Sequence, residues 1–418
     1  MNVENPAPAV GFLFDNYSLS MCVVGAKALG LGELFMPDLL EFVVQNGGAW
    51  GLGEGLDWLN SGGKALAAKY SAATTDFLNH DPAFLNRVYA DVSPKLAGTL
   101  PYLELADFSM KIRAGEPVEI PVSVDPSVFF TQAIDPIWAQ ARAKAYLDYR
   151  SKGKAGSDSE VLRISKASVE SGELRLSAQP TRYFCQAESN LVLDRKVTIQ
   201  NQLGEADQVS LRGLITQSNG ARLPDLADPR LANSLGVAIC FLSKHDDGSL
   251  SVRMVHRNHN VAVFPNGIHP AMSCAIRWPD DVRQVTTMDL MDMILPDIEE
   301  EMRQETGLSP AHYSRPVPLS FCREFLRGGK PQLFCLSVTG LSPSELIAAR
   351  DQQMAHNKRE RPEKVEMRCS GLIRSNDPSV VLGKNAPIGL THEGAASLFL
   401  IDRFFRKANP DGESAITP

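Results

Sequence analysis

The sequence has few aromatic residues and no excess of positive charge. Aromatic residues make up 7% of the 418 positions, and 42 lysines and arginines stand against 49 aspartates and glutamates, a formal net charge of -7. A protein held on nucleic acid by its bulk charge needs a basic field that neutralises backbone phosphates. The composition therefore disfavours nucleic acid as a general partner and leaves only a local basic patch open.

Long apolar runs and a secretory leader are also missing. A helix that crosses a bilayer needs about 18 or more consecutive apolar residues, and no such stretch occurs. Residues 1–10 contain prolines and lack a basic start followed by an apolar run. We therefore expect no membrane partner and a cytoplasmic location.

Closely spaced cysteines are absent as well. The seven cysteines are odd in number, and none forms a Cys-x-x-Cys pair or a Cys/His group with zinc spacing. We expect buried thiols in a reducing compartment. The residues concerned are Cys22, Cys185, Cys240, Cys274, Cys322, Cys335 and Cys369.

The first part of the chain is rich in alanine, leucine and glycine. Residues 1–150 are therefore expected to form a mostly helical N-terminal domain of unknown role, and the small polar run 151–159 is typical of a linker. Alternating valine and isoleucine with an internal proline predict an edge strand or extended segment within 116–130. The expected helices are 37–44, 62–77 and 137–150.

Short half-apolar runs separated by turns begin after residue 159. Residues 160–390 therefore predict an α+β domain, with a hairpin formed by 236–242 and 250–255 around an Asp-Gly turn. The segment 391–418 is expected to contain a final amphipathic helix that docks on the rest. Further elements are expected as strands at 161–164, 173–176 and 332–338 and as helices at 287–306 and 342–356.

An acidic helix within this domain carries the most informative pattern. Pro296 suits a helix start and Gly307 a helix stop. Asp297, Glu301 and Glu305 are spaced four residues apart and share one helix face. Carboxylates displayed in this way could hold a hard divalent cation against a phosphate, whereas the alternative is an ordinary solvated acidic face.

The sequence around this helix resembles the Nudix hydrolase family. The conserved motif of that family, the Nudix box, is Gly-x5-Glu-x7-Arg-Glu-U-x-Glu-Glu-x-Gly-U, where U is apolar. Glu301 falls on the first helix glutamate, Gln304 and Glu305 fall on the glutamate pair, and Gly307 with Leu308 falls on the terminal Gly-U. Residues 262–268 resemble the loop that enters the box.

The sequence departs from the box at several positions. Glu300 replaces the arginine that orients the helix in the family, and Gln304 replaces one of two glutamates that hold metal. Gly267 lies too far before the helix, so an insertion must intervene. Asp292 has the spacing of the missing loop glutamate.

The resemblance implies a Nudix-like α/β/α sandwich in the C-terminal half. It also implies metal-dependent hydrolysis of a nucleoside diphosphate-linked substrate with Mg2+ or Mn2+. The site residues that follow are catalytic Glu301 and Glu305, metal ligands Glu301, Gln304, Glu305 and Glu300, and substrate-binding Arg323, Arg327, Lys330 and Gly267.

Two other interpretations stay open. A catalytically degenerate Nudix fold would sense a nucleotide or act as a regulatory or interaction module, and it would need the pocket without the metal. A scaffold whose helix is merely acidic is the other alternative. Homo-oligomer formation through the N-terminal domain is also open.

Overall fold

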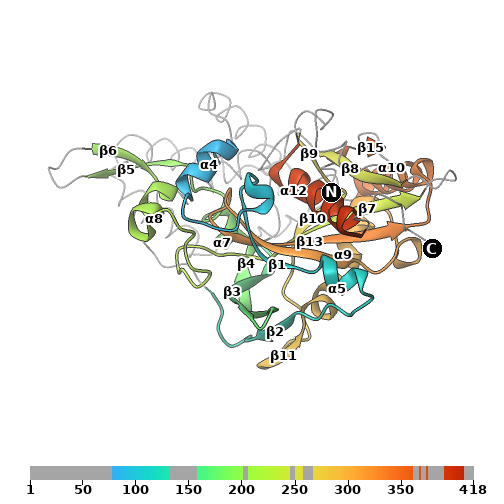
Figure 1. Ribbon diagram of the computed structural model, residues 1–418, viewed down its shortest axis with the longest axis horizontal. Coiled ribbons are helices and arrows are strands. Elements are labelled where there is room, and N and C mark those ends of the chain that lie inside the picture. The colour runs from blue at the N-terminus through green and yellow to red at the C-terminus, as the bar shows by residue number, and fades with distance from the viewer. Residues whose placement is uncertain are drawn as a thin grey trace, which may run out of the picture. The chain divides into compact units, whose positions relative to one another are not determined.

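The computed structural model describes residues 78–130, 158–200, 206–244, 250–257, 267–360, 367–368, 373–374 and 390–408. These residues all fall in one compact unit, which mixes helices with strands as the sequence predicts (Figure 1). The expected helices at 37–44, 62–77 and 137–150 lie outside the described residues, as does the expected linker up to residue 157.

The larger sheet joins strands from both ends of the described chain. Strands β13 and β7 run parallel to each other, whereas the other pairings in this sheet are antiparallel. Its main path is β1 (Tyr102–Asp107), β12 (Val317–Glu324), β13 (Lys330–Thr339), β7 (Gly236–Lys244), β8 (Leu250–Arg257) and β14 (Met367–Arg368). Three further strands attach to it, namely β10 (Met272–Ala275) on β7, and β9 (Ile268–Pro270) and β15 (Ile373–Arg374) on β8.

A second sheet contains the strand expected within 116–130. Its order is β11 (Thr286–Asp289), β2 (Pro121–Val124), β4 (Glu173–Arg182) and β3 (Glu160–Glu170). β2 is shorter than expected and lies inside the sheet, because β11 pairs with one side of it and β4 with the other. A separate hairpin joins β5 (Lys196–Gln200) to β6 (Ala206–Ser210).

The helices expected near 342–356 and in the tail are both present. Ser342 and Glu345 form a reciprocal capping box: the Ser342 N–H donates to the Glu345 carboxylate at 2.7 Å, and the Glu345 N–H donates to Ser342 Oγ at 3.3 Å. The α-helices are α4 (Pro82–Val88), α5 (Ser109–Arg113), α7 (Tyr183–Ala187), α8 (Leu211–Asn219), α9 (Leu290–Thr306), α10 (Pro343–Glu360) and α12 (His392–Ala408).

Helix α9 begins earlier than Pro296, so the start expected from that proline is wrong. Asp289 caps the helix, because its Oδ1 accepts the N–H groups of Met291 and Asp292 at 2.9 and 3.2 Å. Pro296 lies inside the helix. The expected end is confirmed, since Gly307 adopts φ 75°, the left-handed conformation that favours glycine at a helix C-terminus.

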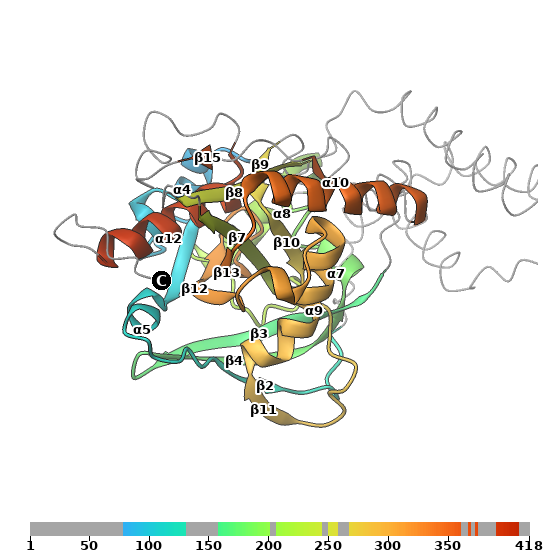
Figure 2. The same cartoon turned by 90° about the vertical axis from the view of Figure 1, so that its right-hand side faces the viewer.

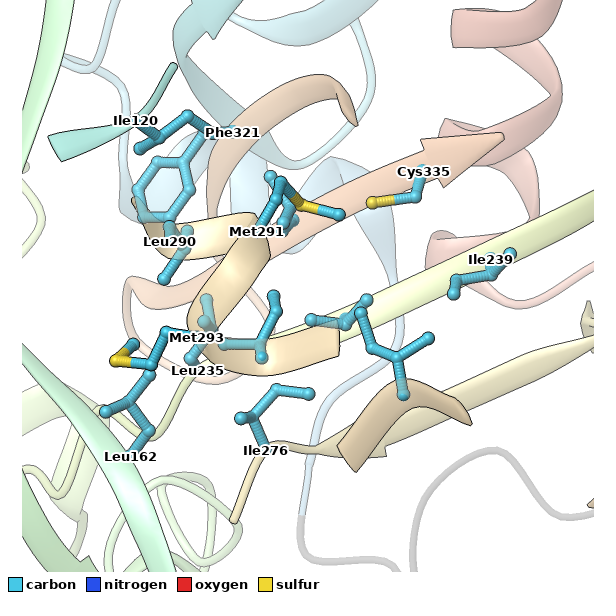
Figure 3. Close-up of a cluster of buried hydrophobic side chains, with 14 of the residues drawn as sticks. Ile120, Leu162, Leu235, Ile239, Ile276, Leu290, Met291, Met293, Phe321 and Cys335 are labelled. Atoms are coloured by element: carbon cyan, nitrogen blue, oxygen red, sulfur yellow. The ribbon is translucent and has the colours of Figure 1, made fainter. Parts of the chain in front are cut away.

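The apolar side of α9 is buried in the main core. Leu290, Met291 and Met293 share one apolar cluster with Phe321 of the larger sheet and Leu162 of the second sheet (Figure 3). Full burial of one such side chain contributes about 1.5–3 kcal/mol relative to leaving it exposed. Since Ile298 and Met302 are also fully buried, this contact fixes the rotation of the helix and the direction of its polar face.

Helix α12 covers the opposite face of the larger sheet (Figure 2). Its residues Leu398, Leu400 and Ile401 share a second apolar cluster with Phe334 and Met254 of the sheet. Helices therefore lie on both faces of the larger sheet. The tail helix docks as the sequence predicts.

Residues 78–130 belong with the later strands, which corrects the expected boundary of the helical domain at residue 150. β1 pairs with β12, and β2 pairs with β4. Arg212, 1% exposed, adds a polar link: its Nη1 donates to Tyr89 Oη at 3.0 Å and to the Phe325 carbonyl at 2.8 Å. Its Nε also donates to Asp194 Oδ1 at 2.7 Å, so the charge is paired inside the protein.

None of the helices within the described ranges combines the length and the apolar character that crossing a bilayer requires.

The N-terminus of α12 contains a buried histidine that makes docking sensitive to acid. His392 is 6% exposed, and its Nε2–H donates to the His80 carbonyl at 2.8 Å. Burial lowers the pKa of His392 to about 4. The unfolded chain, with a histidine pKa of about 6.5, therefore takes up a proton before the folded chain does, so stability falls as the pH drops below about 6.5.

We expect this histidine to account for about 2 kcal/mol of the stability lost between pH 6.5 and pH 5. His392→Gln should lose correspondingly less over that interval, as measured by urea unfolding at several pH values. The exposed His312 provides the control, and His312→Gln should follow the wild type. Equal acid sensitivity of His392→Gln and the wild type would contradict the assignment.

Candidate functional site

The predicted carboxylates of α9 face strand β10. This orientation follows from the surroundings of Cys274 in β10. Burial raises the pKa of its thiol well above the ordinary value, and the charges of Glu301, Asp297 and Glu305 raise it further. Glu301 and Glu305 are half-buried. The four-residue spacing therefore brings three acidic groups of one helix toward one strand, as the sequence predicts for a shared face.

Two of the predicted metal ligands form a hydrogen bond with each other within α9. Gln304 Nε2 donates to Glu300 Oε1, and Arg303 Nη2 makes an ion pair with Glu300 Oε2 at 2.5 Å. The hydrogen bonds from Arg303 and Gln304 lower the pKa of Glu300. Glu300 therefore serves as a side-chain partner within α9.

Asp297 is held by an arginine from the end of β10. The Arg277 N–H donates to Asp297 Oδ2 at 2.7 Å, and Arg277 Nε makes an ion pair with Asp297 Oδ1. The Asp297 side chain is 10% exposed, whereas that of Arg277 is 48% exposed. Burial lowers the pKa of Arg277, but Asp297, Glu301 and Glu300 outweigh it and raise the pKa overall.

This donor set fits a divalent metal poorly. Mg2+ prefers oxygen ligands and is commonly held by carboxylates. In the described part of the chain, no three histidine, cysteine, aspartate or glutamate side chains are grouped as a metal site requires. Of the predicted ligands, Glu301 and Glu305 raise the pKa of Cys274 in β10 through their charges, whereas Glu300 and Gln304 are bonded to each other.

Arg323, which the resemblance predicts to bind substrate, is buried in the protein interior. Arg323 is 9% exposed. Its Nε donates to the Gly329 carbonyl at 2.9 Å and its Nη2 donates to the Pro224 carbonyl at 2.5 Å. Burial lowers its pKa to about 10. These bonds stabilise the turn between β12 and β13.

Arg327 and Lys330 of the same turn join a buried charged cluster on the α12 side of the sheet. Arg327 Nη1 lies 3.2 Å from Glu324 Oε2. Lys330 is 2% exposed, and its Nζ donates to Gln332 Oε1 at 3.2 Å. The charges that act on Lys330 come from Arg327, Glu324, Glu393 and Cys274. The pKa of Cys274 is raised by burial and by the α9 carboxylates and lowered by Lys330.

Glu393 is a central member of this cluster that the sequence did not single out. It is 2% exposed and accepts hydrogen bonds from Ser273 Oγ at 2.5 Å and Gln332 Nε2 at 3.1 Å. Its Oε2 also lies 3.6 Å from His269 Nε2. Burial raises its pKa. No local pattern signals this grouping, because its members come from β9, β10, β13 and α12.

Two glycines lie beside this cluster. The predicted substrate-loop residue Gly267 is buried next to β9, whose Ile268 carbonyl accepts the Thr391 N–H at 2.9 Å. It therefore lies near the start of α12. Gly236 leaves room for two polar side chains, since a Cβ there would come within 2.2 Å of Lys330 Nζ and 2.1 Å of Gln332 Oε1.

Comparisons with known proteins assign no family and include a distant structural likeness. No protein-family model matches the chain, and no curated protein matches it. Among solved structures, the chain is similar to the crystal structure of DR0079 from Deinococcus radiodurans, at 14% identity and a TM-score of 0.25, over 51% of this chain and 100% of that one. A likeness at this level supports no conclusion about fold or function.

The buried lysine gives the cluster a distinct alkaline response. Burial, followed by the charge of Arg327, lowers the pKa of Lys330 to about 8. Between that value and the unfolded value of about 10.4 the unfolded chain binds more protons than the folded chain, so Lys330 contributes a stability that rises with pH.

The stability of the wild type relative to Lys330→Met should therefore increase by about 1 kcal/mol from pH 8 to pH 9. Chemical denaturation of both proteins across this range measures the difference. Lys166→Met removes an exposed lysine and should show no such trend. A difference between wild type and Lys330→Met that stays flat with pH would show that Lys330 titrates normally.

Proposed function

We propose that the chain is a catalytically degenerate Nudix-like module that binds a nucleoside diphosphate derivative without needing a divalent metal. The order of elements supports the fold assignment. The family has a strand pair, an acidic helix, a strand and a further helix in this order. Here β7 and β8 precede the acidic helix α9, with β9, β10 and β11 between them, and the hairpin of β12 and β13 and then α10 follow it. Helices on both faces of the larger sheet agree with an α/β/α arrangement.

One observation carries the metal-independent part of the proposal. The acidic face of α9 already has partners for its charges within the protein, through Arg277 on Asp297 and through Arg303 and Gln304 on Glu300. Two bonded carboxylates are poor ligands, because a metal would have to displace an existing cation or hydrogen bond. Regulation by ligand binding needs no such displacement.

Metal-dependent hydrolysis by a Nudix-type pyrophosphohydrolase is the second candidate. Glu301 and Glu305 favour it, since both remain on the side of α9 that faces β10. If Mg2+ or Mn2+ binds, these two residues would hold it, and the metal would supply the charge that polarises a diphosphate. The chain's own contribution would be to fix both carboxylates on one rigid helix turn.

A panel of nucleoside diphosphate sugars, ADP-ribose, dinucleotides and nucleoside triphosphates separates the candidates. We expect at least one compound to raise the melting temperature by several degrees in EDTA, since ligand at 100 times its Kd stabilises by about 2.7 kcal/mol. We expect no phosphate or nucleotide release in Mg2+ or Mn2+. Product formation should be followed for each compound alongside the thermal shift.

Three variants make the distinction sharp. If hydrolysis occurs, Glu301→Gln and Glu305→Gln should each reduce its rate by about 100-fold or more. This result would reject the nucleotide-sensing proposal in favour of the hydrolase. Glu299→Gln is the matched control. The charge of Glu299 raises the pKa of Tyr313 and is not among the charges that raise the pKa of Cys274. A panel that neither binds nor turns over would contradict both candidates.

A further inference from the structure

Arg277 occupies a fixed position beside the acidic face of α9. It lies two residues beyond the end of β10 and forms an antiparallel bridge with Val161 of β3. The next residue, Trp278, donates its N–H to the Glu160 carbonyl at 3.0 Å. Its own N–H donates to Asp297 Oδ2 at 2.7 Å. The backbone of this arginine is therefore held between a strand and a helix.

The guanidinium of Arg277 contacts one carboxylate and interacts electrostatically with two more. Its Nε pairs with Asp297, and the charges of Glu301 and Glu300 act on it as well. With 48% of the side chain exposed, it keeps one side toward solvent while the Asp297 side chain is 10% exposed. A planar cation with five N–H donors can contact several acceptors from one position.

We propose that Arg277 is a built-in counter-ion, which supplies to the α9 carboxylates the positive charge that a divalent cation would otherwise supply. This inference rests on the proposed metal-independent function. It accounts for the closeness of the acidic residues of α9, because the charges of Asp297, Glu301 and Glu300 are offset by a fixed cation whose backbone is held by β3. Arg277 is a positioning residue in this account.

Removal of this charge should make the acidic face respond to metal. In Arg277→Gln we expect the melting temperature in EDTA to fall, and millimolar Mn2+ at constant ionic strength to restore it by about 3–8 °C. The wild type should shift by less than about 1 °C under the same conditions, because Arg277 occupies the position. Differential scanning fluorimetry of the full chain measures both values.

Two further variants distinguish charge from simple damage. Arg277→Lys keeps the charge and should respond to Mn2+ as the wild type does, and it stays informative if Arg277→Gln fails to fold. Arg277→Gln combined with Glu301→Gln should lose the Mn2+ response, because a carboxylate of the face is missing. Arg283→Gln removes an exposed arginine from the following loop and should also match the wild type.

Three results would overturn the inference. These are an equal Mn2+ shift in wild type and Arg277→Gln, no Mn2+ shift in a folded Arg277→Gln, and a new Mn2+ response in Arg283→Gln. None of these measurements uses a nucleotide. Failure of the nucleotide panel with a Mn2+ response confined to Arg277→Gln would therefore reject the proposed function and keep the counter-ion.

Discussion

Burial of the apolar side of α9 is the interaction on which the rest of this structure depends. Leu290, Ile294, Ile298 and Met302 recur at helical spacing and are fully buried, so the helix cannot rotate without exposing them. At about 1.5–3 kcal/mol for each side chain, their burial outweighs repulsion between carboxylates that are partly in solvent. The acidic face is therefore directed at β10 by the core behind it.

The polar groups of the larger sheet are divided between its two faces. On the α9 side, partly buried carboxylates lie near the half-exposed Arg277. On the α12 side, Glu324, Lys330 and Glu393 are almost completely buried. Removing one member of such a buried group costs several kcal/mol, because its partner is left without compensation in a poorly solvated place. We therefore regard the α12 cluster as structural and the α9 face as the candidate site.

Local pattern predicted many elements of this chain, because it reports short-range physics. The helices expected at 287–306 and 342–356 and the Gly307 stop all depend on residues a few positions apart, and the structure confirms them. The start inferred from Pro296 is wrong for a local reason as well. Pro296 is a good first residue of a helix, but Asp289 provides the stronger cap and places the proline inside.

The sequence by itself determined that the chain carries an acidic helix, a mixed α and β architecture and a docked tail helix. Tertiary structure decided the partners of the charges. Arg277 and Asp297 are 20 positions apart, and Gln332 and Glu393 are 61 apart. Such pairs form only when strands and helices pack, because the entropy of closing long loops is offset by the core and not by the pairs themselves. For the same reason, β1 and β2 joined the later strands and not a separate helical domain.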